Sequence, residues 1–321
     1  MTTILITIDT EYDFGFTRRH GVASRRENFA RSIACTTPSG SVGVDYQMDV
    51  FDRHGLKAVF FVDPMPALVW GTAAIEDVVG PIVARGHDVQ LHIHTEWLEL
   101  AGGANPLGAR TGTNIKDFTW EEQCLLLDHA RATLVAAGAP SPVAFRAGNY
   151  GANDDTLRAL AHLGLAFDTS HCPGIVASLC DISLSAEDRA PMHHCGVTEV
   201  PIGCIAAPGG GLRHAQLTAL SAGEILAALA HAQRQGVADF TLVSHSFELL
   251  SRDRTRINQI VKRRFERLCV ALGARGVASG IYRSDPPVAA QRAVPVLPHN
   301  PLRMGWRLAE QALSNALYGA G

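Results

Sequence analysis

The stretch TILITIDTE, from Thr3 to Glu11, begins as an apolar, β-branched run and ends in acidic side chains. An apolar run of this length predicts a short strand that is buried on both faces. LKAVFFVD (Leu56–Asp63) and HDVQLHIH (His87–His94) follow the same pattern. Predicted helices separate these runs, at Asp45–Gly55 and Ala73–Gly86, and each ends at a glycine, where helices commonly stop.

The alternation of strands and helices continues along the chain and indicates the fold class. Strands that alternate with helices and lack polar positions form parallel sheets covered by helices. At least six such units favour a barrel over an open sheet, so we predict an α/β fold. Two long loops are expected to interrupt it, at roughly Phe14–Val44 and Leu100–Phe118. Further helices are predicted at Thr119–Gly138, Asn153–Gly164, Ser221–Gly236 and Arg256–Gly276, with Thr119 and Glu122 in capping-box register.

The composition excludes several classes of protein. Of the 321 residues 47% are hydrophobic and 18% are charged, and the formal net charge is −3, so a large core can form and no nucleic-acid partner is expected. The seven cysteines form no CxxC pair, and the N-terminal MTTILITIDTEYD lacks the features of a signal peptide. No window has the length and apolarity of an integral membrane segment. We therefore expect a cytoplasmic protein with reduced thiols.

Polar side chains follow the predicted strands at the points where they end. Because the carboxyl ends of parallel strands lie at one rim, where α/β folds carry their active sites, these side chains are expected to converge. They are Asp9 and Glu11 after the first strand, His92 and His94 after the third, and Arg146, Asp168 and His245 after later ones.

His92 and His94 have the spacing of a metal site. Side chains two residues apart point to the same face of a strand, so the two imidazoles can bind one ion. A carboxylate from a neighbouring strand would complete three protein ligands and leave a place for water. Asp9 and Glu11 also share a face, so one could bind the metal while the other acts as a base. The alternative is that the histidines only hydrogen-bond to each other and to the backbone.

The order of these motifs resembles that of the polysaccharide deacetylases, the carbohydrate esterase family 4 with the NodB-homology fold. TIDTE is similar to the first family motif, GHDVQLHIH to the second, FRAGNYG to the third and LVSH to the last. HGLKAVFFV, FDTS and TEVP resemble strands of the family, and the resemblance covers roughly residues 3–277. It implies a distorted (β/α) barrel of about seven parallel strands, NodB-like, and the intracellular sugar-pathway branch of the family.

The resemblance also implies roles for the residues outside the metal site. Asp9 would be the catalytic base, with Arg146 orienting it, and His245 would be the general acid. Asn149 and Tyr150 are expected to contact the substrate, and a backbone N–H near Tyr150 to stabilise the oxyanion.

For the metal, the resemblance implies Glu11 and His92 as ligands of a divalent ion, with zinc expected. The second histidine of the family falls on Glu96, so this chain departs from the family pattern. His94 and Glu96 are both candidates for the remaining ligand, and the same-face geometry favours His94.

The predicted function is a metal-dependent hydrolase that removes an N-acetyl group from a sugar or glycoconjugate. Its partner would be a small-molecule or glycan substrate that bears an acetamido sugar. Two alternatives stay open: a C–N hydrolase of the same fold that acts on a non-sugar amide, and a catalytically degenerate barrel that binds carbohydrate.

We expect a barrel domain over residues 1–290 and a C-terminal extension over residues 291–321. The extension includes a predicted amphipathic helix, Asn300–Leu317, which would pack on the barrel or on a second subunit of a homo-oligomer. A role at a membrane surface is a lesser alternative. The apolar positions at helical spacing are Leu302, Trp306, Ala309, Leu313 and Ala316.

Overall fold

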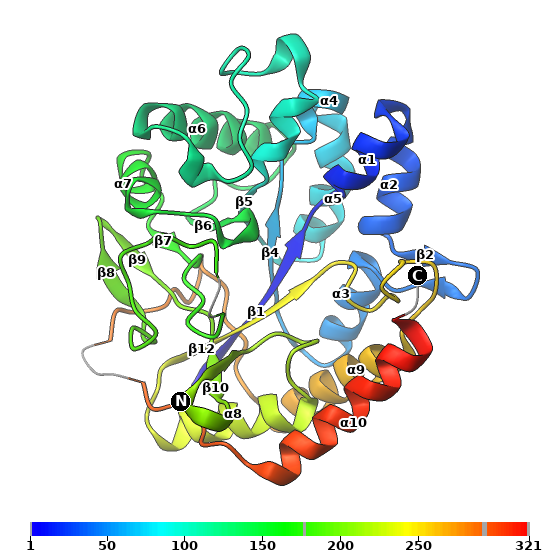
Figure 1. The fold of residues 1–321 in the computed structure, drawn as a ribbon, viewed down its shortest axis with the longest axis vertical. Coiled ribbons are helices and arrows are strands. Elements are labelled where there is room, and N and C mark those ends of the chain that lie inside the picture. Colours follow the sequence, from blue (N-terminus) through cyan, green and yellow to red (C-terminus); the bar gives the residue numbers. More distant parts are fainter. Residues whose placement is uncertain (1, 176–177, 291–293, 320–321) are drawn as a thin grey trace.

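A computed structural model describes residues 2–175, 178–290 and 294–319 of the chain. Its centre is a curled eight-stranded sheet in the order β12-β1-β4-β5-β6-β7-β9-β8, as Figure 1 shows. Seven of these strands run parallel, which confirms the predicted α/β class and the strand number. They are β1 (Thr3–Thr10), β4 (Val59–Val62), β5 (Asp88–Ile93), β6 (Ala144–Ala147), β7 (Phe167–Asp168), β9 (Val197–Glu199) and β12 (Asp239–His245), and the antiparallel edge strand is β8 (Met192–His194).

The barrel is distorted between β9 and β12, where loop residues rather than a strand form the backbone hydrogen bonds to β12. Past β9 the backbone N–H of Gly203 donates to Thr241 of β12 at 2.9 Å. Further along, Val243 of β12 donates to Ala215 at 2.8 Å and accepts from Leu217 at 3.1 Å. The two short ribbons outside the main sheet are β2 (Thr36–Thr37) with β3 (Gly40–Ser41) and β10 (Cys204–Ala206) with β11 (Leu212–His214).

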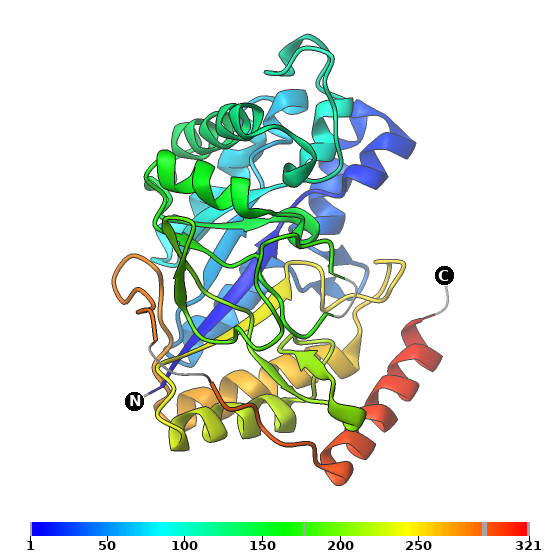
Figure 2. The same ribbon diagram turned by 60° about the vertical axis from the view of Figure 1, so that its left-hand side comes forward.

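Helices cover the outside of the curled sheet, as Figures 1 and 2 show. The apolar sides of these helices close one large core with the strands, as the unbroken apolar runs predicted. Their bounds are α3 (Val44–Arg53), α4 (Ala67–Trp70), α5 (Ala73–Ala84), α6 (Trp120–Ala136), α7 (Asp154–His162), α8 (Ala222–Arg234) and α9 (Gln259–Ala274).

Local signals in the sequence fix several of these elements. All six residues of β5 are buried, as are all four of β4 and of β6. At the start of α6 the Thr119 hydroxyl accepts from the backbone of Glu122 at 3.3 Å, and the Glu122 carboxylate accepts from the backbone of Thr119 at 2.9 Å. This is the capping box that the sequence predicted.

The prediction of a long loop over Phe14–Val44 is wrong. The segment Phe14–Val44 contains α1 (Phe14–His20), α2 (Arg25–Ser32) and the β2–β3 ribbon. Both helices are short and mostly polar, so they show little apolar periodicity in the sequence. The second loop, Leu100–Phe118, contains only two short 3-10 turns, η3 (Gly102–Ala104) and η4 (Ile115–Asp117).

The predicted C-terminal helix forms as α10 (Pro301–Tyr318) and packs on α8 and α9. The helix thus packs on the barrel, one of the two expected positions, but polar side chains make the contacts and the large apolar side chains are exposed. The domain boundary at residue 290 stays a prediction, and residues 291–293 lie outside the described residues. Within the described ranges, no helix has the length and apolarity needed to span a bilayer.

Candidate active site

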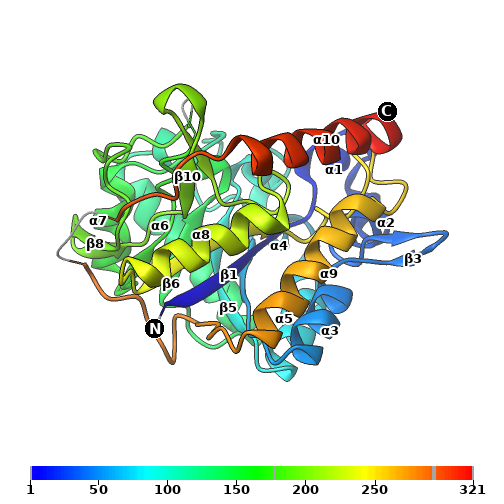
Figure 3. The same ribbon diagram turned by 90° about the horizontal axis from the view of Figure 1, so that it is seen from below.

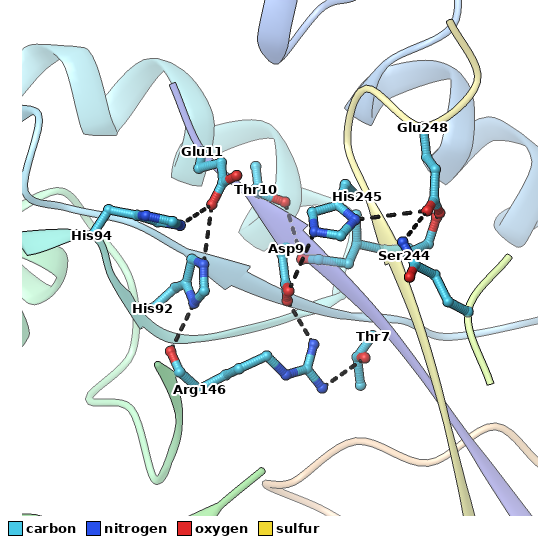
Figure 4. Close-up of polar contacts among 12 residues, drawn as sticks. Thr7, Asp9, Thr10, Glu11, His92, His94, Arg146, Ser244, His245 and Glu248 are labelled. Carbon is cyan, nitrogen blue, oxygen red and sulfur yellow. Dashed lines mark hydrogen bonds and ion pairs between the residues drawn. The ribbon is translucent and has the colours of Figure 1, made fainter. Parts of the chain in front are cut away.

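The carboxyl ends of β1, β5, β6 and β12 bring the predicted site residues together. In the sheet, Asp9 lies beside His245 of β12, and His92 of β5 lies beside Arg146 of β6. Glu11 follows β1 directly, so its carboxylate projects over the same rim. Figure 4 shows that these side chains point toward one another from four different strands.

Glu11, His92 and His94 form a compact group of donor atoms. The Glu11 Oε2 atom lies 3.1 Å from Nε2 of His92 and 2.6 Å from Nε2 of His94. One donor atom from each residue lies within 4.8 Å of the other two. One carboxylate oxygen with two imidazole nitrogens is a set that zinc accepts in catalytic sites, with a fourth position left open.

The far nitrogen of each imidazole has a partner that fixes the orientation of the ring. Nδ1 of His92 lies 2.7 Å from the backbone oxygen of Arg146, and Nδ1 of His94 lies 3.0 Å from the Glu96 carboxylate. Such contacts keep Nε2 free to bind a metal and raise its basicity. The structure therefore groups His94 with Glu11 and His92, and it places Glu96 behind His94.

The charges around Glu11 favour a cation at this position. Burial by itself raises the pKa of Glu11, but the charges and hydrogen bonds of His94 and His92 outweigh it and hold the pKa well below its usual range. Burial by itself lowers the pKa of His94, but Glu11 and Glu96 raise that pKa well above its usual range. The group thus stabilises positive charge between its donor atoms, as a divalent cation would supply.

Asp9 lies in a different environment, although it is only two residues from Glu11. Its Oδ1 atom accepts from Nη1 of Arg146 at 2.6 Å, and both side chains are buried. The other guanidinium nitrogen, Nη2, donates to the Thr7 hydroxyl at 2.9 Å, and the guanidinium lies over the Phe61 ring at 4.4 Å. The guanidinium is thus fixed in place and keeps an opposite charge against Asp9.

His245 lies across from Asp9 and against Glu248. Its Nε2 atom is 3.9 Å from Oδ2 of Asp9, and its Nδ1 atom is 3.8 Å from Oε1 of Glu248. Burial by itself lowers the pKa of His245, but the Glu248 interaction and the charge of Asp9 outweigh it and raise that pKa to about 9. His245 is therefore protonated at neutral pH and faces the buried Asp9 carboxylate across a short gap.

Glu248 is a site residue that the sequence analysis missed. Its carboxylate accepts from the Ser244 hydroxyl at 2.5 Å and the Thr218 hydroxyl at 2.7 Å, and also from the Gln216 amide. The signal available was an acid three residues after the strand-end histidine, in SHSFELL. An acid after a strand is most often a helix cap, which is why this signal is weak.

Asp63 is the second residue missed, although it directly follows β4 in the same way that Glu11 follows β1. Its Oδ1 atom accepts from the backbone of Met65 at 3.0 Å and of His94 at 3.4 Å. Its Oδ2 atom is buried and has no hydrogen-bond partner among the described residues. Burial raises the pKa of Asp63 to about 7. The backbone N–H groups of Met65 and His94 hold this carboxyl group next to the His94 backbone.

The turn η5 (Gly148–Tyr150) crosses over His94 in a strained conformation. Asn149 and Tyr150 have φ angles of 55° and 56°, which residues other than glycine rarely adopt. A Cβ atom on Gly148 would lie 2.6 Å from the backbone oxygen of Ile93 and 2.8 Å from the His94 ring. Asn149 lies near Glu96, with 3.4 Å between Nδ2 and Oε1, so this predicted substrate residue borders the group formed by Glu11, His92 and His94. Backbone strain of this kind is concentrated at functional sites.

A second group with donor atoms within 4.8 Å of one another consists of Asp154, His194 and Cys195. Both oxygens of Asp154 already accept from Ser183, at 2.9 Å from the backbone and 2.6 Å from the hydroxyl. Asp154 also lies in the first turn of α7, where the helix dipole disfavours a cation. We assign no metal to this group.

Comparison with known proteins gives matches at the level of structure. No protein-family model matches the sequence, and no curated protein matches it. A crystal structure described as a polysaccharide deacetylase from Mycobacterium smegmatis matches 92% of this chain and 95% of its own, with a TM-score of 0.49 and 15% identity. A family 4 carbohydrate esterase from Streptomyces lividans matches 90% of this chain and 98% of its own, with a TM-score of 0.46 and 12% identity.

The chain is similar in structure to the polysaccharide deacetylases of carbohydrate esterase family 4. A 4-alpha-glucanotransferase from Thermococcus litoralis also matches, over 88% of this chain and 37% of its own, with a TM-score of 0.47 and 10% identity. At these identities the likeness concerns the fold, and the chemistry has to be argued from the residues of this chain. The intracellular branch of the family stays a prediction.

Proposed function

We propose that this protein is a metal-dependent deacetylase that hydrolyses an N-acetyl group on a sugar or glycoconjugate. The observation that carries the proposal is the convergence of two different sets of groups at one rim. Glu11, His92 and His94 offer three metal ligands, and Asp9 with His245 offers a base and an acid directly beside them. A pure binding protein has no use for the second set.

The donor set fits a divalent metal, for which zinc is the proposed ion. Both imidazoles present Nε2 to the Glu11 carboxylate, and both are held by partners on the opposite nitrogen. When bound, the metal would polarise the acyl carbonyl group and lower the pKa of a water molecule. Glu96 is proposed to support His94 from behind.

Asp9 is the proposed base. Its Oδ2 atom faces the gap toward His245, while Oδ1 is held by the buried Arg146 guanidinium. Asp9 would take a proton as the water oxygen forms a bond to the acetyl carbon. Arg146 would orient the carboxylate, since its buried guanidinium holds Oδ1 at 2.6 Å and leaves Oδ2 toward the gap.

His245 is the proposed acid. Its raised pKa of about 9 keeps it protonated at neutral pH, so it can donate a proton to the nitrogen as the C–N bond breaks. The products are acetate and a free amine. Glu248 contacts Nδ1 and leaves Nε2 facing the gap, which makes Glu248 the positioning residue for His245.

The η5 turn is proposed to bind the acyl oxygen and the substrate. The left-handed conformation of Asn149 and Tyr150 turns their backbone at the border of the metal group. A backbone N–H at Tyr150 would stabilise negative charge on that oxygen, as preorganised donors do in acyl transfer.

The resemblance of the motifs to the deacetylases supports a sugar as the substrate, and the products of the reaction test it. We expect acetate release from N-acetylglucosamine oligosaccharides by the metal-loaded protein, and its loss in His92→Ala. The matched control is His20→Ala, since His20 is exposed on α1, away from the donor set. Hydrolysis of simple amides without acetate release from sugars would instead support the C–N hydrolase of non-sugar amides, and binding without any hydrolysis the degenerate barrel.

A further inference from the structure

The helix α10 exposes its apolar side and places polar side chains against the rest of the molecule. A surface helix normally faces the core with its apolar side. On α10 the large apolar side chains are exposed: Leu302 is 85% exposed, Trp306 64%, Leu313 54% and Leu317 50%. They recur at helical spacing and form one continuous outer face, which we call the α10 apolar face. A contiguous exposed apolar face of this kind marks an interaction site.

Polar contacts hold the inner side of α10 to the rest of the molecule. Glu310 pairs with the buried Arg264 of α9 at 2.9 Å, and the Ser314 hydroxyl accepts from the Asn258 side chain at 2.9 Å. Ser314 is the only buried residue of the helix. These contacts fix the direction in which α10 faces, so the apolar face is displayed by the fold. Figure 3 shows α10 at the margin of the molecule, along α8 and α9.

Arginines border the α10 apolar face. In residues 252–275 and 300–318, every charged side chain that is exposed is an arginine, and the set consists of Arg252, Arg256, Arg263, Arg267 and Arg275. The acids of these segments are partly buried and already bonded, as Glu310 is to Arg264 and Glu266 is to Lys262. Arg263 and Arg267 line a groove of about 260 Å³ between α9 and α10, together with Trp306 and Leu313.

We propose that this face docks the protein on a membrane surface rich in anionic lipid. The α10 apolar face would enter the boundary between headgroups and acyl chains, with Trp306 at the headgroup level. Arg263 and Arg267 of α9 would contact the lipid phosphates, since basic residues next to an apolar helix face are drawn to anionic lipids. The proposal does not depend on which reaction the active site catalyses.

The charges argue against a second copy of this chain as the occupant. Two α10 apolar faces that met across a two-fold axis would bring together two sets of the arginines on α9. Like charges placed together across an interface are unfavourable, and no exposed acid of these segments stands ready to pair with them. An anionic lipid surface meets the same arginines with opposite charge.

The test is flotation of the full chain with vesicles of phosphatidylcholine, alone or with about a third of phosphatidylglycerol. We expect binding to the anionic vesicles only, with a blue shift of Trp306 emission that is absent in Trp306→Phe. The triple variant Leu302→Ser/Trp306→Ser/Leu313→Ser and the double variant Arg263→Glu/Arg267→Glu should each lower the partition coefficient more than tenfold.

The matched controls change exposed side chains elsewhere. Leu125→Ser on α6 and Arg19→Glu/Arg26→Glu on α1 and α2 should leave the partition coefficient unchanged. The proposal is overturned if the wild type does not float, if it floats equally with neutral vesicles, or if the α10 variants float as the wild type does. A dimer in light scattering that the triple variant abolishes, without vesicle binding, would instead assign the face to a second copy.

Discussion

Asp9 lies on β1 and Glu11 directly follows that strand, so the two carboxylates are only two residues apart, but their surroundings are opposite. Glu11 faces the Nε2 atoms of His92 and His94 at 3.1 and 2.6 Å. Asp9 faces the Arg146 guanidinium at 2.6 Å. Imidazoles can exchange a proton for a metal ion, whereas a guanidinium keeps its charge and offers no lone pair. We therefore propose that Glu11 binds the metal and that Asp9 is the base.

This difference comes from the neighbouring strands. Glu11 lies just past the end of β1 and faces His92 of β5, whereas Asp9 is flanked by β12 and reached by the Arg146 side chain of β6. The sequence analysis could therefore predict that one of the two binds metal, while the choice between them came from the family resemblance.

The largest effect is expected from Asp9→Asn, which removes the proposed base and leaves the three proposed metal ligands unchanged. Acetate release should fall roughly 10²- to 10⁴-fold, the usual contribution of a general base, while bound metal stays at the wild-type level. The buried Arg146 loses its partner, so the free energy of unfolding should fall by about 3–5 kcal/mol. Steady-state kinetics, elemental analysis and denaturant unfolding measure the three effects. Asp155→Asn, at an exposed carboxylate paired with Arg158, is the control and should change none of them.

A smaller effect is expected on the metal side from Glu96→Gln. Removing the carboxylate behind His94 should weaken metal affinity about 10- to 100-fold, as loss of such a supporting residue usually does. Competition with a fluorescent chelator measures the affinity, and saturating metal should restore most of the activity. Glu99→Gln changes an exposed acid of the same turn (η2, Thr95–Glu99) and serves as the control. If Glu96→Gln abolished binding at any metal concentration, Glu96 would be a direct ligand.

The smallest effect is expected from Glu248→Gln, and it appears mainly in the pH profile. The pKa of His245 lies above its ordinary value of 6.5, so activity that needs protonated His245 should fall as pH rises through about 9. Without the Glu248 charge this alkaline limb should move to lower pH. Stability follows the same sign: the contribution of protonated His245 is full below pH 6.5 and is lost as pH rises through about 9.

The pH profile of kcat should be measured beside that of Glu187→Gln, whose carboxylate is exposed and far from His245. An unchanged alkaline limb in Glu248→Gln would remove Glu248 from the positioning role.

The strand and helix pattern of the barrel was predictable because its strands are unbroken apolar runs and its helices begin or end at recognisable capping residues. The helices α1 and α2 were not, since they are short and polar and only a few of their residues are buried. Residues such as Asp63 and Glu248 were missed because an isolated acid after a strand looks like an ordinary cap. Their positions depend on partners distant in the sequence: the His94 backbone for Asp63, and Gln216 and Thr218 for Glu248.

For the helix α10, the sequence predicted the helix but not the face that packs against the rest of the molecule. Its helical period was predicted correctly, but periodicity does not say which face turns inward. The inward face was decided by Glu310 and Ser314, which find polar partners on α9 and just before it.

Metal content across three variants tests the central claim most directly. After reconstitution with zinc and removal of excess ion, one metal per chain is expected in the wild type and in Asp9→Asn. Glu11→Gln and His92→Ala should retain almost none under the same conditions. Loss of the metal in Asp9→Asn while Glu11→Gln keeps it, or no bound metal in the wild type, would contradict the assignment of the two carboxylates.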